Sequence, residues 1–181
     1  MGRVVAVDLC NTVAAVNAAI AACLGLGAGW VWETYSLEPA GIRDAEAWFR
    51  GHPEVFAEAE PVPGAAEALD GLAAAGWEIV YLTARPEWAR GLSVEWLRRR
   101  GFPQGRLVMT QDKAAACTVL GISAAVEDSP EQIRALSRVV PVYAPAQPYN
   151  GSPLGWWEIV RMLERRFPRT DEGAAGRRWT R

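Results

Sequence analysis

Short apolar runs alternate along this chain with longer segments in which apolar residues recur every three or four positions. Brief, bounded runs that are rich in β-branched residues are typical of strands buried on both faces of a parallel sheet. The longer segments have the spacing of helices, and most of them end at glycine or proline. The predicted strands are the run from Val4 to Asp8, Trp77–Leu82, Leu107–Met109, Ile122–Val126 and Val139–Tyr143. The predicted helices are Val13–Leu24, Ile42–Arg50, Glu54–Glu58, Ala65–Ala75, Glu87–Arg100, Asp112–Leu120, Glu131–Arg138 and Trp156–Phe167.

The order of these elements predicts an α/β protein with a Rossmann-like, parallel five-stranded sheet. Strands that alternate with helices form βαβ units with right-handed crossovers. The helical stretch between the first strand and Pro61 is too long for a plain crossover, so we expect a small helical cap inserted after the first strand. This organisation assigns residues 1–12 and 62–167 to the α/β core, 13–61 to the cap, and 168–181 to a flexible C-terminal tail of low apolar content.

Polar residues stand where several of the predicted strands end. Asp8, Thr83 and the pair Glu127-Asp128 each follow a strand, and Lys113 comes just beyond a fourth one. Open α/β sheets bind ligands at the carboxyl ends of their strands. Each residue alone has a plain structural explanation, such as a helix cap or a solvated surface position. Their common position makes them candidates for one functional site.

Composition narrows the classes of function. A net charge of −2 gives no reason to expect binding to duplex nucleic acid or to an anionic membrane. The three cysteines (Cys10, Cys23 and Cys117) form no C-x-x-C pair, which argues against a disulfide framework or a structural zinc site. No apolar stretch is long enough for a membrane span or a secretory signal, so we expect a cytoplasmic protein. Lys113 is the single lysine beside eighteen arginines, as expected if this position needs a compact ammonium group.

The order of the strand-end residues resembles the haloacid dehalogenase-like (HAD) superfamily. That superfamily has a strand ending in D-x-D-x-T, a strand ending in Thr or Ser, a lysine, and a strand ending in paired acids. The corresponding segments are Asp8-Leu-Cys-Asn-Thr12, Tyr81-Leu-Thr83, Lys113 and Val126-Glu-Asp128-Ser. The resemblance spans residues 1 to about 150 and implies a HAD-like core.

Within the superfamily, three features look like cytosolic and phage-type 5′-nucleotidases. They are the segment Leu82-Thr-Ala-Arg-Pro86, the nearby Val94-Glu-Trp-Leu97 and the early helical cap. The same three features also resemble the phosphatase domain of polynucleotide kinases. The resemblance therefore implies a phosphatase acting on a small phosphorylated substrate, with a nucleotide as one such substrate.

The resemblance also implies a role for each residue. Asp8 would be the nucleophile that forms an aspartyl-phosphate, and Lys113 would offset the repulsion between two anions. Thr83, with Ala84, Arg85 and Lys113, would bind the phosphate. A Mg²⁺ ion would be held by the Asp8 carboxylate, the backbone carbonyl of Cys10 and the Asp128 carboxylate, with Glu127 as an auxiliary acid.

The first motif departs from the family pattern at its third position, where Cys10 replaces an aspartate. In the family that aspartate is the general acid/base, and a thiol with an ordinary pKa near 8.5 replaces it poorly. General acid–base catalysis contributes roughly 10²- to 10⁴-fold. Cys10 is thus a catalytic-site position of altered chemistry, and poor leaving groups should suffer most.

Several hypotheses follow from Cys10 and stay open at the level of sequence. The protein is a slow phosphatase or one confined to activated leaving groups, or another group supplies the acid, with His52 as the candidate. A surface or capping role is the simpler interpretation of His52. Alternatively, the chain is a non-catalytic phosphate-binding or protein-interaction module, or a dehalogenase- or phosphonatase-like hydrolase. The sequence also leaves open whether the protein is a monomer or a dimer, and whether the aromatic residues of the predicted cap stack on a substrate or only form its core (Trp30, Trp32, Tyr35, Trp48 and Phe49).

Overall fold

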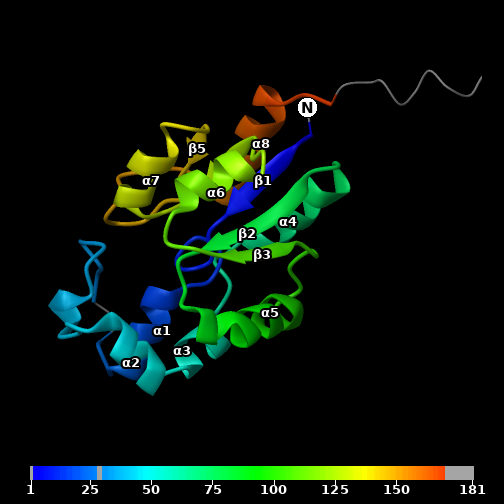
Figure 1. The fold of residues 1–181 in the computed structure, drawn as a ribbon. Coiled ribbons are helices and arrows are strands. Elements are labelled where there is room, and N and C mark those ends of the chain that lie inside the picture. Colours follow the sequence, from blue (N-terminus) through cyan, green and yellow to red (C-terminus); the bar gives the residue numbers. More distant parts are fainter. Residues whose placement is uncertain (1, 28–29, 170–181) are drawn as a thin grey trace, which may run out of the picture.

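The computed structural model describes residues 2–27 and 30–169, which form a parallel five-stranded sheet flanked by helices (Figure 1). The strand order is β3-β2-β1-β4-β5, and all four neighbouring pairs are parallel. The strands are β1 (Val4–Val7), β2 (Glu78–Thr83), β3 (Arg106–Met109), β4 (Ala124–Val126) and β5 (Val142–Tyr143). The predicted α/β class and the five-stranded parallel sheet are confirmed.

The helices fall into two groups by their position along the chain. Between β1 and β2 lie α1 (Val16–Cys23), the 3₁₀-helix η1 (Glu38–Ala40), α2 (Ala45–Gly51), α3 (Glu54–Glu58) and α4 (Ala65–Ala74). After β2 come the 3₁₀-helix η2 (Glu87–Ala89), α5 (Arg90–Arg99), α6 (Lys113–Val119), α7 (Pro130–Leu136) and α8 (Trp156–Arg166).

The sheet is buried on both faces because alternate strand residues pack into two separate cores. Val5 and Val7 of β1 belong to a large core that also contains buried residues of α4, α5 and α8. Ala6, between them, points to the other face and packs with Cys117 of α6 and Leu136 of α7. This alternation is what the continuous apolar runs of the strands require.

The segment that follows β1 lies beside the segment that precedes α4. The backbone N–H of Ala15 donates to the carbonyl of Glu60 at 2.8 Å, and the N–H of Val62 donates to the carbonyl of Val13 at 2.8 Å. The helix predicted from Val13 therefore begins only at Val16, because the backbone of residues 13–15 pairs with the returning chain. The segment that carries α1, η1, α2 and α3 lies at one end of the sheet (Figure 1).

The strand predicted over Val139–Tyr143 is also shorter in the structure. The N–H groups of Val139 and Val140 donate to the carbonyl of Leu136 and so complete the end of α7. Pro141 has no N–H to offer to a neighbouring strand, so β5 begins at Val142.

In the part of the chain that the structure describes, no helix is both long and apolar enough to cross a bilayer. The predicted flexible tail, residues 168–181, lies outside the described residues from residue 170 onwards.

Candidate active site

The carboxyl ends of three adjacent strands bring the predicted site residues together. Asp8 follows β1, the central strand, and its backbone N–H extends the ladder by donating to Val126 at 3.0 Å. Thr83 is the last residue of β2 on one side, and Glu127 and Asp128 follow β4 on the other. All four side chains are buried, and the exposed fraction is at most 6%. Asp8 is 75 positions from Thr83 and 120 positions from Asp128 in the sequence, and parallel pairing of the strands makes them neighbours.

Lys113 enters this group from the first turn of α6. The side chain of Asp112 caps that helix by accepting from the N–H of Ala115 at 2.9 Å, which starts the helix at Lys113. The ammonium group donates to Asp8 Oδ1 and to Glu127 Oε2, both at 2.6 Å, and the residue is 3% exposed. Burial would lower the pKa of Lys113, but the charges of Asp8 and Glu127 raise it above its ordinary value. Lys113 is therefore a permanent cation in contact with Asp8.

The oxygens of Glu127 are already used within the protein. Oε2 accepts from Lys113, and Oε1 accepts from the backbone N–H groups of Asp128 and Ser129 at 3.2 and 3.0 Å. Such a carboxylate fixes the position of its partners. Glu127 thus holds Lys113 against Asp8 and shapes the turn that presents Asp128.

Asp128 is held by Thr12, the last residue of the first motif, and by two residues that the sequence analysis did not single out. Its Oδ1 accepts from the Thr12 hydroxyl at 2.7 Å and its Oδ2 from the Tyr149 hydroxyl at 2.6 Å. The side-chain amide of Asn150 donates to the backbone carbonyl of Asp128 at 3.1 Å. In the sequence, Tyr149 and Asn150 belong to the turn-forming stretch Pro148-Tyr-Asn-Gly151, which follows the fifth strand. Because it follows the carboxyl end of a parallel strand, this stretch could have been expected at the same edge of the sheet as Asp128.

Asp8, Glu127 and Asp128 together are able to hold a metal ion. One carboxylate oxygen from each lies within 4.8 Å of the others. Burial and the charge of Asp8 raise the pKa values of Glu127 and Asp128 above their ordinary range. Three buried carboxyl groups face one ammonium group, so ionising all three together is unfavourable without a further positive charge, which a divalent cation would supply.

Cys10 contacts a buried arginine. Arg85 Nε donates to Cys10 Sγ at 3.2 Å, its Nη1 donates to Ser93 at 3.0 Å, and its guanidinium carbon lies 4.3 Å from the centre of the Phe56 ring. Arg85 Nη2 is buried without a hydrogen-bond partner among the described residues. Burial raises the pKa of the Cys10 thiol, and the charge of Arg85 offsets this only in part. Cys10 therefore remains a protonated thiol at neutral pH.

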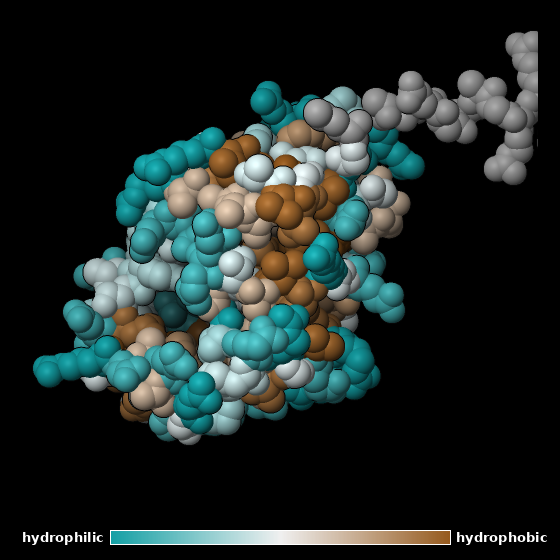
Figure 2. All heavy atoms as spheres, viewed as in Figure 1, coloured by the Kyte–Doolittle hydropathy of each residue, from teal (hydrophilic) through white to brown (hydrophobic). Residues whose placement is uncertain are grey.

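A cavity of about 530 Å³ opens onto these residues. Asp8, Cys10, Thr83, Arg85 and Lys113 line it from the sheet side, and the surface is hollowed between the helices at lower left and the strand ends (Figure 2). The opposite wall is formed by the segment between β1 and α4 that carries α1, η1, α2 and α3, called the inserted segment below. Its lining residues include Ile20, Tyr35, Leu37, Phe49 and Phe56.

The aromatic residues of that segment divide into distinct groups. Tyr35 and Phe49 line this cavity, and Tyr35 packs edge-on against Tyr149 with ring centres 5.6 Å apart. Trp30 and Trp32 line a different cavity, and Trp48 packs on His52 with ring centres 4.4 Å apart. Of these five residues, Tyr35 and Phe49 are therefore the ones placed to contact a ligand at Asp8, beside Phe56 in the same cavity wall.

His52, the candidate for an alternative acid, is not among the described residues that line the cavity of Asp8. Its Nδ1 contacts Glu54 Oε1 at 3.1 Å and Cys23 Sγ at 3.5 Å. The structure thus gives His52 partners within the inserted segment.

The strand order, the residues at the strand ends and the insertion after β1 define a hydrolase of the HAD superfamily. The model of one family, described as "5' nucleotidase, deoxy (Pyrimidine), cytosolic type C protein", matches residues 25–150. The chain belongs to this family. The matched residues include Thr83, Lys113 and Asp128, whereas Asp8 and Cys10 precede them.

Solved structures share the fold at low sequence identity. A dehalogenase aligns with a TM-score of 0.58 and 14% identity over 89% of this chain and 96% of the other. The L-2-haloacid dehalogenase from Xanthobacter autotrophicus with chloropropionic acid covalently bound aligns with a TM-score of 0.54 and 13% identity over 91% and 88%. A predicted phosphoglycolate phosphatase from Haemophilus somnus aligns with a TM-score of 0.54 and 15% identity over 89% and 97%. A comparison with curated protein sequences found no match.

Proposed function

We propose that the protein is a Mg²⁺-dependent phosphohydrolase that forms an aspartyl-phosphate on Asp8. Its substrate would be a small phosphorylated metabolite, with a nucleotide favoured by the family to which the chain belongs. The observation that carries this proposal is the hydrogen bonding of the two Asp8 carboxylate oxygens. Oδ1 is held by Lys113 at 2.6 Å, and Oδ2 accepts no hydrogen bond from the described residues, so it remains available to attack phosphorus from the cavity wall.

The groups around Asp8 suit a phosphoryl group. Thr83 Oγ1 accepts from the backbone N–H of Arg85 at 3.2 Å, which leaves the hydroxyl hydrogen free to donate to a phosphate oxygen. The ammonium of Lys113 lies beside the nucleophile and would stabilise the charge that accumulates during attack. Arg85 has one unpartnered nitrogen among the described residues and lines the same cavity, which favours its role in anion binding.

The donor set fits magnesium. Mg²⁺ prefers oxygen ligands, and the Asp8 and Asp128 carboxylates with the backbone carbonyl of Cys10 would hold it, Glu127 remaining auxiliary. When bound, the ion would supply charge neutralisation on the phosphoryl group. The three buried carboxyl groups support this assignment, because a divalent cation would stabilise their ionised forms.

Cys10 determines which leaving groups the site can expel. A protonated thiol that is held by Arg85 neither protonates an alkoxide well nor activates water. Substrates whose leaving group departs as a stable anion, such as an aryl oxide or a phosphate, need the least help. We therefore expect faster turnover on aryl phosphates and acyl phosphates than on alkyl phosphates.

The cavity supports a substrate of nucleotide size. Its volume of about 530 Å³ falls within the roughly 300–1,000 Å³ that is usual for small-molecule sites. Tyr35 and Phe49 offer aromatic surface on the cavity wall opposite the sheet, on which the base of a nucleotide would stack.

Asp8→Asn tests the proposal with an aryl phosphate and Mg²⁺. The amide keeps the shape of the side chain but cannot form the acyl phosphate, so hydrolysis should fall to the background rate. Asp70→Asn, an exposed position in α4, is the matched control and should retain full activity. Circular dichroism would establish that both variants fold, and activity in folded Asp8→Asn would remove Asp8 as the nucleophile.

A second function is favoured specifically by Cys10. A halide leaves without a proton, so displacement of halide by Asp8 does not need the acid that Cys10 cannot provide. Halide release from a 2-halo acid in the presence of a chelator would support dehalogenase-like chemistry over the phosphatase proposal. Asp128, which such chemistry does not need as a metal ligand, favours the phosphatase.

A non-catalytic phosphate-binding module is the remaining alternative that Cys10 allows. Stabilisation of the fold by Mg²⁺ with phosphate, and no turnover on a broad panel of phosphate esters and anhydrides, would support this module.

A further inference from the structure

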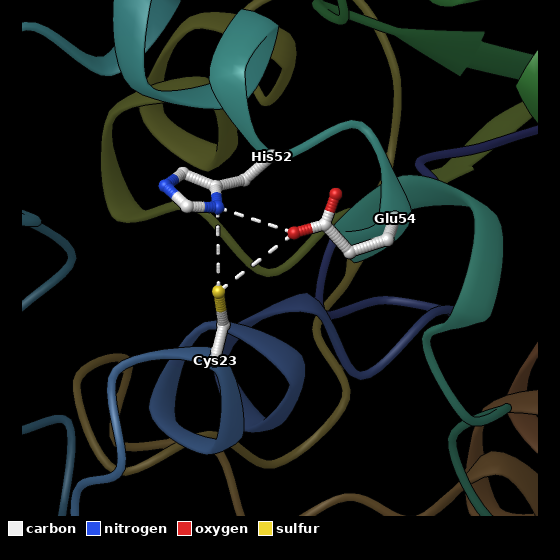
Figure 3. Close-up of side chains that lie close together, drawn as sticks. All are labelled: Cys23, His52 and Glu54. Atoms are coloured by element: carbon white, nitrogen blue, oxygen red, sulfur yellow. Dashed lines mark hydrogen bonds and ion pairs between the residues drawn. The ribbon is translucent and has the colours of Figure 1, made fainter.

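Three side chains with mixed donor atoms meet on the inserted segment, away from the cavity of Asp8. Cys23 is the last residue of α1, His52 follows the end of α2, and Glu54 is the first residue of α3. Figure 3 shows the three side chains pointing toward one another. Cys23 Sγ lies 3.5 Å from His52 Nδ1 and 3.9 Å from Glu54 Oε1, and His52 Nδ1 lies 3.1 Å from Glu54 Oε1.

The arrangement does not suit a proton relay of the kind found in cysteine hydrolases. In such a relay the thiol contacts one ring nitrogen of histidine and the acid contacts the other. Here Cys23 and Glu54 both approach Nδ1, which carries at most one hydrogen. The three donor atoms form a closed triangle, and a shared cation at its centre accounts for this convergence.

The triangle has the dimensions of one face of a tetrahedral zinc site. With Zn–S of about 2.3 Å, and Zn–N and Zn–O of about 2.0–2.2 Å, tetrahedral angles place S and N about 3.5 Å apart, S and O about 3.6 Å apart, and N and O about 3.4 Å apart. The observed separations of 3.5, 3.9 and 3.1 Å each lie within about 0.3 Å of these values. A zinc ion therefore fits with small side-chain adjustments.

The local structure holds two of the three ligands, His52 and Glu54, in place. Pro53 has φ −64° and links α2 to α3, so His52 and Glu54 project from the two sides of a constrained turn. The carbonyl of His52 accepts from the N–H of Val55 at 3.2 Å, and Val55 is buried in the core next to Glu54. Trp48 packs against the His52 ring with an interplanar angle of 31°. Ligands on such supported positions lose little freedom when a metal binds.

The donors also differ in kind from those at Asp8. A thiolate, an imidazole and a carboxylate together favour a borderline metal such as Zn²⁺, whereas all-oxygen sites favour Mg²⁺. His52 is the only histidine of the chain. The side chains of His52 and Glu54 are 39% and 54% exposed, so the ion can enter and water can fill the fourth position. The backbone N–H of Glu54, followed by His52, lowers the pKa of the Glu54 carboxyl and keeps it ionised at neutral pH.

We propose that Cys23, His52 and Glu54 bind one Zn²⁺ ion, which ties the end of α1 to the turn between α2 and α3. The site is independent of the proposed hydrolysis at Asp8. The absence of a C-x-x-C pair argued against structural zinc at the level of the sequence. The proposed ligands have no such spacing, because Cys23 comes from one segment and His52 and Glu54 come from another. The role of the zinc ion is to cross-link the inserted segment, which forms one wall of the cavity of Asp8.

Cobalt substitution tests the site through a signal that needs sulfur. Purified protein that is reduced, freed of metal and saturated with Mg²⁺ would be titrated with Co²⁺. We expect a thiolate-to-cobalt charge-transfer band in the near ultraviolet, with visible bands of tetrahedral intensity at one equivalent. Cys23→Ser should abolish the charge-transfer band. Cys10→Ser is the matched control and should retain it, as should Asp8→Asn, in which the proposed catalytic metal site is damaged.

A second measurement addresses the structural role. In excess Mg²⁺, micromolar Zn²⁺ should raise the melting temperature of the wild type and leave that of His52→Gln and Cys23→Ser unchanged. Absence of the charge-transfer band in the wild type, or its persistence in Cys23→Ser, would overturn the proposal. An equal zinc-induced shift in the wild type and both variants would overturn it as well.

Discussion

At the scale of single residues, Cys10 is the position that separates this chain from the pattern of its superfamily. The thiol lies beside Asp8 in the cavity, and Arg85 donates a hydrogen bond to its sulfur. A cysteine has the same backbone carbonyl as an aspartate, so the proposed metal ligand survives the change. In the proposed mechanism, proton transfer to the leaving group is the step that Cys10 would impair.

Cys10→Asp should therefore restore proton transfer. We expect turnover of alkyl phosphates to rise by roughly 10- to 10²-fold, and that of aryl phosphates much less. The gain stays below the full 10⁴ because Arg85 would stabilise the ionised form of the new carboxyl group, so that less of it carries the proton that the leaving group needs. The measurement is the ratio of kcat for an alkyl and an aryl phosphate.

Cys10→Asn is the control for that experiment, because it adds polarity without an acidic proton and should give no gain. If Cys10→Asp also leaves the ratio unchanged, another group already transfers the proton.

At the scale of secondary-structure elements, the pairing of β3 with β2 depends on a close contact at Gly105. Gly105 precedes β3, which pairs with the strand that carries Thr83. A Cβ atom at Gly105 would lie 2.6 Å from the carbonyl oxygen of Ile79 and 2.9 Å from the ring of Tyr81. Since the first of these atoms belongs to the backbone of β2, the chain at this point accommodates only glycine without a shift of one strand.

Gly105→Ala should accordingly lower the free energy of unfolding by about 1–3 kcal/mol through overpacking. Gly71→Ala is the matched substitution in α4, where a Cβ would meet nothing within 4 Å. It should raise stability by about 0.5–1 kcal/mol, because alanine is the better helix former. Urea denaturation of the two variants measures both effects. Equal changes in the two variants would mean that the contact with Ile79 does not constrain the strand.

At the scale of the whole molecule, the site brings together the loop after β1, the segment after β5 and the inserted segment. Asp128 is held by Thr12 from the loop after β1 and by Tyr149 from the segment after β5. Tyr149 in turn packs against Tyr35 of the inserted segment. A ligand that binds at Asp8 and Asp128 therefore stabilises contacts among the sheet, the insertion and the C-terminal part of the core.

Binding of Mg²⁺ should consequently stabilise the entire fold. At a concentration 100 times its Kd, a ligand specific for the folded state adds about 2.7 kcal/mol. For a chain of this size that corresponds to a rise of about 5–10 °C in melting temperature. Differential scanning fluorimetry with and without Mg²⁺ measures the shift. Asp128→Asn should reduce it strongly and Asp70→Asn should not, and an undiminished shift in Asp128→Asn would place the ion elsewhere.

The sequence determined the sheet and the residues at its edge, because both depend on local information. Apolar runs that end in a polar residue predict where parallel strands stop, and the parallel arrangement then collects Asp8, Thr83 and Asp128 at one edge. The rarity of lysine likewise marked Lys113, whose ammonium group contacts two buried carboxylates. Element boundaries were less accurate, since the start of α1 at Val16 depends on pairing with residues near Glu60.

Only the tertiary structure decided which distant side chains meet. The contacts of Tyr149 with Asp128, of Arg85 with Cys10 and of Cys23 with His52 join segments from 21 to 75 residues apart. No local pattern encodes such contacts, because they arise from how helices and loops pack once the sheet has formed. For the same physical reason the sequence marked Asp8 and Lys113, whereas the partners of Cys10 and the ligands of the proposed zinc ion emerged only from the fold.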